Sequence, residues 1–215
     1  RPFRTTAIHE FGHAVGLGHE DDEYNSMGED WSHIHVNNGT LQCYPGEDAA
    51  DGAVAIYGTD ASAGQDLSVT HWKYSGSDGE YSDHTKTVIY DSGGSTLSSV
   101  SEDGGDTRRY EVYPGQVVKV EFTLENNGRS SQTIRVGFYV SSNDNISTSD
   151  TLIDTRTPTL GRGDVYTITD TVTIPSTLTV GNDYYLGAYV DYDDTISEYD
   201  DNNNSTYIPI RIVSP

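Results

Sequence analysis

Three histidines, a glutamate and a glycine at fixed spacings near the start of the chain constrain its local fold most strongly. Residues 9–19 read HEFGHAVGLGH, which fits the pattern HExxHxxGxxH. His9 and His13 are four residues apart, so a helix places both imidazoles on one face, where they reach a single ion. Gly16 lacks a Cβ atom, so the chain can leave the helix there with a positive φ angle and bring His19 back toward the same ion. The spacing therefore predicts a metal site of three histidines at the end of a helix.

The residue types in this pattern indicate catalysis. Three neutral imidazoles leave the fourth position of a tetrahedral zinc ion open, which is typical of catalytic zinc. Glu10 lies about 100° around the helix from His9, close enough to hold a water molecule without becoming a ligand. We therefore predict Zn²⁺ as the cofactor and Glu10 as the general base. The alternative is an ordinary amphipathic helix with exposed histidines, which does not explain the added glycine and third histidine at fixed offsets.

The full pattern resembles the signature of the metzincin zinc peptidases. Met27 lies eight residues after His19, a short separation similar to that of the matrixin-like metzincins. The resemblance implies that Met27 forms a hydrophobic floor beneath the three histidines. Residues 45–58 read PGEDAADGAVAIYG, which predicts a helix of about three turns. This segment resembles the closing helix of matrixin catalytic domains, so residues 1–58 look like the C-terminal part of a matrixin-like metallopeptidase domain.

Two features depart from that family. No tyrosine stands two places after Met27, so the tyrosine ligand of astacin-like relatives has no counterpart, and Glu10 and the metal are left to stabilise the oxyanion. In matrixin-like enzymes a twisted sheet and a supporting helix precede the zinc helix, whereas this sequence starts eight residues before His9. Residues 1–58 are too few to bury a large core alone. We therefore expect either a separate, cleaved upstream half as a partner or a larger precursor of which this sequence is a piece.

The pattern changes to a period of two after a small, polar linker at residues 59–65. Residues 118–124 and 134–140 alternate apolar side chains with mostly polar ones. Only 33% of the residues are hydrophobic and glycine is abundant, which favours a β-rich protein with many turns. Further strands are expected at residues 67–74, 86–90, 165–174, 184–190 and 206–213. About seven short antiparallel strands predict an immunoglobulin-like sandwich. The predicted fold class is α+β, with a helical zinc-site subdomain and an all-β immunoglobulin-like sandwich.

Residues 66–215 resemble the CARDB-type, adhesion-related β-sandwich of secreted bacterial and archaeal proteins. The matching features are DLSV at 66–69, Pro-Gly before Val117, ENNG at 125–128 and the acidic ending VDYDDTISEYDDNN at 190–203. The resemblance implies a domain used for adhesion or targeting.

The acidic ending also offers oxygen ligands for a calcium ion. The spacing differs from that of an EF-hand, and the alternative is an Asx-rich hairpin satisfied by its own backbone. The candidate Ca²⁺ ligands are Asp191, Asp193, Asp194, Glu198 and Asp200.

The formal net charge of −22 repels nucleic acid and anionic membranes, so we exclude both as partners. No apolar run is long enough to span a membrane. Together these features predict a secreted, extracellular or cell-surface zinc endopeptidase that acts on a protein or peptide substrate. The alternative is a structural or adhesive protein that self-assembles through the sandwich and carries an inactive peptidase remnant.

Overall fold

A computed structural model describes residues 3–20, 22, 25–27, 35–37, 40–42, 46–60, 62, 64–77, 82–102 and 107–215. The chain is mostly β, with two α-helices near the N-terminus. In chain order the elements are α1 (Phe3–Ala14), β1 (His35–Asn37), β2 (Thr40–Gln42), α2 (Glu47–Tyr57), β3 (Leu67–Thr70), β4 (Trp72–Ser77), β5 (Ser82–Lys86), β6 (Ile89–Asp91), β7 (Ser99–Ser101), β8 (Arg108–Val112), β9 (Val117–Asn126), β10 (Gln132–Thr133), β11 (Val136–Ser141), β12 (Thr151–Arg156), β13 (Thr159–Leu160), β14 (Val165–Thr173), β15 (Asp183–Val190), the 3₁₀ turn η1 (Asp201–Asn203) and β16 (Ser205–Ile212).

Two sheets form the β-sandwich that the alternating pattern predicts. One sheet has the strand order β12-β11-β15-β16-β8-β7, and the other has the order β14-β9-β3, with β6 also paired to β9. Phe122 of β9 and Phe138 of β11 are fully buried, and their ring centroids are 6.3 Å apart across the two sheets. The core therefore lies between the sheets, where apolar burial supplies most of the stabilisation.

A hairpin interrupts the strand predicted at residues 67–74. Strand β3 ends just before His71. It pairs with one end of β9, and β6 pairs further along the same edge of β9. Between them β4 and β5 form the hairpin, which is closed at its base by a 2.8 Å bond from the Thr87 amide to the His71 carbonyl. The single-strand prediction was wrong here because periodicity does not show where a strand leaves its sheet.

The sequence predicts antiparallel strands, but one pair of strands in the sandwich is parallel. Strand β8 runs parallel to β16, with Ile210 opposite Tyr110. This strand and β7 fall outside the predicted strands, as does β12, whose side chains are mostly exposed or half-buried. Strands β12 and β7 are the two edges of their sheet, and edge strands bury too little of one face to produce a clear alternation in sequence.

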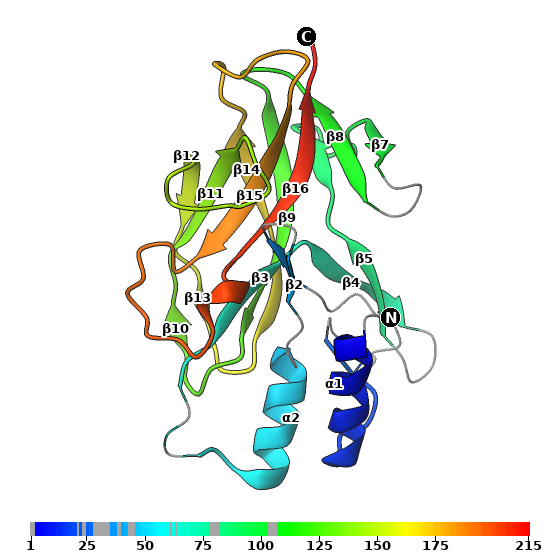
Figure 1. The fold of residues 1–215 in the computed structure, drawn as a ribbon, viewed down its shortest axis with the longest axis vertical. Coiled ribbons are helices and arrows are strands. Elements are labelled where there is room, and N and C mark those ends of the chain that lie inside the picture. Colours follow the sequence, from blue (N-terminus) through cyan, green and yellow to red (C-terminus); the bar gives the residue numbers. More distant parts are fainter. Residues whose placement is uncertain are drawn as a thin grey trace.

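The two helices lie side by side at one end of the sandwich, while the C-terminus lies at the opposite end (Figure 1). Tyr57 at the end of α2 donates a 2.7 Å hydrogen bond from its hydroxyl to the carbonyl oxygen of Val15, just after α1. A Cβ atom on Gly52 of α2 would lie 2.8 Å from a methyl carbon of Leu17. The end of α1 is therefore packed closely against α2. None of the described helices is long and apolar enough to cross a membrane.

Candidate metal centre

Gly16 ends α1 and turns the chain back on itself. Its φ angle is 94°, a conformation that favours glycine. The Gly16 amide donates to the His13 carbonyl and the Leu17 amide donates to the Gly12 carbonyl, each at 3.0 Å. These two bonds are those of a Schellman motif, which satisfies carbonyls at the helix end. The turn brings His19 back toward the helix face that carries His13.

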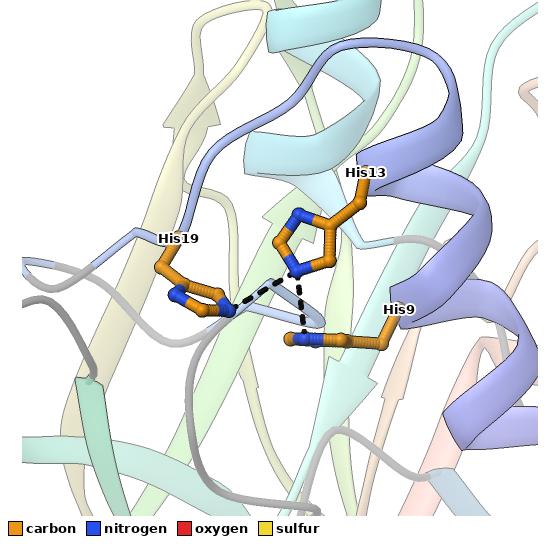
Figure 2. Close-up of side chains that lie close together, drawn as sticks. All are labelled: His9, His13 and His19. Atoms are coloured by element: carbon orange, nitrogen blue, oxygen red, sulfur yellow. Dashed lines mark hydrogen bonds between the residues drawn. The ribbon is translucent and has the colours of Figure 1, made fainter.

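The three histidines of the motif converge through their Nε2 atoms (Figure 2). The Nε2 atom of His13 lies 3.2 Å from that of His9 and 3.1 Å from that of His19. The ligand atoms of all three lie within 4.8 Å of one another. His9 is 7% exposed, whereas His13 and His19 are only partly buried, so solvent reaches the group from one side.

Backbone carbonyls orient two of these imidazoles. The Nδ1 atom of His9 is 2.9 Å from the Ser26 carbonyl oxygen, and that of His13 is 3.0 Å from the Leu17 carbonyl oxygen. A carbonyl oxygen only accepts, so both Nδ1 atoms carry a proton and donate it. In the neutral imidazoles, both Nε2 atoms are then acceptors with lone pairs directed into the group.

Converging acceptors match the coordination sphere of a cation. Two neutral nitrogen lone pairs about 3 Å apart repel each other, and a positive ion between them removes that cost. Tetrahedral zinc with bonds of about 2.05 Å sets its nitrogen ligands about 3.3 Å apart. The observed 3.1 and 3.2 Å, from His13 to each of the other two histidines, are close to that value.

Met27 packs against α1, the helix that carries His9 and His13. It is 1% exposed, and a Cβ atom on Gly12 would lie 2.2 Å from its sulfur atom. Asn25 holds this turn by accepting a 2.6 Å hydrogen bond from the Met27 amide. Ser26 lies in the same turn and accepts the hydrogen bond from His9. The turn therefore packs against α1 through Met27 and orients His9 through Ser26.

Glu10 follows the first histidine in α1, and its side chain is exposed. Adjacent residues project about 100° apart around a helix, so Glu10 lies beside the metal-facing side of α1. It is outside the group of three close ligand atoms, and its role as the general base stays a prediction.

Four of the five acidic candidates for calcium have side-chain partners within the protein. Asp191 accepts hydrogen bonds from the Thr195 and Ile196 amides, and Asp193 pairs with Arg135 at 2.8 Å. Glu198 accepts from the Leu67 amide and the Asn204 side chain, Asp200 accepts from the Asn202 amide, and Asp194 sits in the turn with a φ angle of 50°. Across the described residues, only the three histidines form a group of His, Cys, Asp or Glu side chains close enough to share one ion. Calcium at this turn stays a prediction.

The sequence did not predict which backbone groups orient the histidines. The carbonyls of Ser26 and Leu17 leave no signal in the sequence, because every residue has one. Gly12 did carry a signal, since a glycine in mid-helix costs stability and usually has a packing reason.

A model of the CARDB family matches residues 104–207. The chain is similar to two solved structures of the CARDB domain of a Pyrococcus furiosus protein, each 18% identical with a TM-score of 0.41. The solution structure covers 70% of this chain and 97% of that domain. The crystal structure, described as a complex with di-metal ions, covers 72% of this chain and 95% of that domain. The comparison with curated proteins gives no match.

Proposed function

Residues 104–207 form a CARDB domain, and we propose that the chain is a secreted zinc-dependent endopeptidase in which this domain is the accessory β-sandwich. One observation supports the proposal most: three Nε2 atoms converge from His9, His13 and His19, with two of the imidazoles held by carbonyls in the ligating tautomer. A structural zinc site would supply four protein ligands, whereas the described residues supply three here. The fourth position is left for a reacting group.

The residues around this position can carry out peptide hydrolysis. Zinc held there would supply a Lewis acid that polarises the peptide carbonyl and lowers the pKa of water toward neutrality. Glu10, exposed beside the site, would accept the proton of the attacking water and deliver it to the leaving amine. Met27 and the Ser26 carbonyl keep the imidazoles in place during the reaction.

Replacing Glu10 with glutamine tests this assignment in the full chain. The substitution keeps the shape of the side chain but removes the base, so we expect zinc content to stay unchanged and hydrolysis of a quenched peptide to fall at least ~100-fold. Glu102→Gln makes the same change on the sandwich, away from the histidines, and serves as the control. Equal peptide hydrolysis by Glu10→Gln and the parent would show that Glu10 is not the base.

The small number of buried apolar side chains around the two helices favours a second function. In the described part of residues 3–58, the buried apolar side chains are Met27 and Ala49, while Phe3 and Phe11 are 85% and 71% exposed. An apolar cavity of about 370 Å³ lies between α1 and α2. These features suit a structural or adhesive protein with an idle site, as predicted in the alternative. Bound zinc without turnover, together with self-association in light scattering, would favour this second function.

A further inference from the structure

We infer that the β-sandwich positions the metal ligands through α2, with Arg162, Asp51 and Gly52 as positioning residues. The inference rests on the metal site of the proposed function but does not require peptide hydrolysis. It assigns the sandwich a role inside the site in addition to adhesion or targeting.

The first step is the contact between the sandwich and α2. Arg162, in the turn between β13 and β14, forms an ion pair with Asp51 of α2. Between the helix and the turns lies a small cavity of about 70 Å³, lined on one side by Ala50 and Val54 and on the other by residues 126–129. The helix therefore lies directly against two turns of the sandwich.

These two turns are firmly held. The side-chain nitrogen of Asn126 donates to the carbonyls of Leu160 and Gly161, at 3.2 and 2.8 Å, and so ties one turn to the other. A Cβ atom on Gly128 would lie 2.9 Å from the backbone of Gln65, which shows how closely the chain after α2 packs on the same turn. Arg162 therefore contacts α2 from a rigid base.

The second step runs from α2 to the histidines. Gly52 follows Asp51 directly, and its missing Cβ leaves room for the Leu17 side chain. The Leu17 carbonyl accepts the hydrogen bond from His13 Nδ1. A displacement of α2 would therefore move the residue that orients the central imidazole.

A second set of hydrogen bonds ties part of the chain before α2 to the sandwich. Asn37 of β1 lies in the segment between the methionine turn and α2. Its side chain accepts a 3.0 Å bond from the Ile146 amide and donates a 2.8 Å bond to the Ser205 hydroxyl. Thr206 of β16 donates to the Val36 carbonyl at 3.0 Å. Strand β1 is thus fixed to the sandwich as well.

Gly52→Ala provides the sharpest test. Alanine favours a helix more than glycine does, so this change stabilises α2 locally while pushing Leu17 away. We expect metal affinity, measured with Co²⁺ against a chelator, to fall about 10-fold, the size of effect typical of residues that orient ligands. The visible spectrum of bound Co²⁺ should change as well. Gly52→Ala combined with Leu17→Ala should recover most of the affinity, and Gly64→Ala, which meets nothing within 4 Å, should leave affinity unchanged.

The ion pair between Arg162 and Asp51 provides an independent test of the inference. Arg162→Ala and Asp51→Ala should each weaken Co²⁺ binding about 3-fold, as expected for the loss of an exposed ion pair, and the double variant should weaken it no further. The exchanged pair Arg162→Asp with Asp51→Arg should restore binding. Arg156→Ala, which breaks ion pairs to Asp154 and Asp170 within the sandwich, is the matched control and should have no effect.

A readout without metal separates the two proposals. Nitrogen NMR of the His13 ring in the metal-free chain reports whether Nδ1 carries the proton that bonds to Leu17. A parent chain that binds Co²⁺ but does not hydrolyse peptide overturns the peptidase proposal alone, while a changed His13 signal in Gly52→Ala still supports positioning. Unchanged Co²⁺ affinity, Co²⁺ spectrum and His13 signal in both Gly52→Ala and Arg162→Ala would overturn the inference.

Discussion

The Nδ1 atom of His9, in α1, lies 2.9 Å from the carbonyl oxygen of Ser26, seventeen residues further along the chain. This bond fixes which nitrogen of the imidazole faces the metal position. It also joins the helix to the methionine turn, so the packing of that turn and the geometry of the ligands depend on each other.

The first prediction concerns the ligands themselves. His13→Gln removes the central imidazole, whose Nε2 atom contacts both of the others. We expect zinc affinity, measured by competition with a chelator, to fall at least ~100-fold, because two imidazoles leave zinc with too few protein ligands. His84→Gln changes another buried histidine, in β5 of the sandwich, and should leave zinc affinity unchanged. Equal losses in the two variants would argue against a site at His13.

The second prediction concerns the close contact between Gly12 and Met27. Gly12→Ala places a methyl group 2.2 Å from the methionine sulfur, so the turn that carries Ser26 must move. We expect a loss of about 1–3 kcal/mol in the free energy of unfolding and a roughly 10-fold loss of zinc affinity. Urea unfolding and chelator competition measure the two effects.

The control for this change lies in the same motif. Gly18 has nothing within 4 Å of an added Cβ atom, so Gly18→Ala should have little effect on either measurement. Combining Gly12→Ala with Met27→Ala should recover part of the zinc affinity. If Gly12→Ala behaves like Gly18→Ala, Met27 does not support the site.

The third prediction concerns the bend after the helix. Gly16 has a φ angle of 94°, and a residue with a Cβ atom pays about 1–2 kcal/mol in that region. Gly16→Ala should lower stability by that amount and weaken zinc binding, because His19 depends on the bend. Gly16→Asn should cost less, since asparagine tolerates left-handed conformations better. The ranking Gly, Asn, Ala in thermal unfolding is the expected outcome, and a reversed order would contradict it.

The fourth prediction concerns pH. Burial raises the pKa of Asp66 to about 7 and that of Glu198 to about 7, whereas unfolded carboxyls titrate near pH 4. The folded chain therefore binds more protons between these values. The stability that these two carboxyls contribute is fully present below about pH 4 and is lost as the pH rises through about 7.

The substitution Asp66→Asn should remove part of the stability loss that occurs as the pH rises through about 7. The variant should be more stable than the parent by roughly 1–2 kcal/mol at pH 8, and the gain should shrink at pH 5. Asp60→Asn removes the same charge at an exposed site, where hydrogen bonds from Ser62 lower the pKa of the carboxyl. It should show no gain at pH 8. A parent chain whose urea stability rises from pH 5 to pH 8 would contradict the account of Asp66.

Much of this arrangement followed from local sequence. The spacing of His9 and His13, the glycine bend and the alternation along β9 depend on residues close in the chain, and periodicity and backbone sterics predict such features. Gly16 has the positive φ angle that the motif requires.

The remaining features depend on residues distant in sequence. The parallel pairing of β8 with β16 and the attachment of Asn37 to the sandwich leave no local pattern. Asp66 and Glu198 are half-buried in the structure, which no local pattern in the sequence indicates. Long-range packing decided each of these points.

X-ray absorption spectroscopy of the zinc-loaded full chain tests the central claim most directly. Three converging imidazoles predict one bound zinc per chain with three nitrogen neighbours at about 2.0–2.1 Å, imidazole outer-shell scattering and one further light atom. His13→Gln should lose this spectrum. A shell of oxygen neighbours without imidazole scattering, or a zinc content near zero, would contradict the metal centre and the enzymatic function built on it.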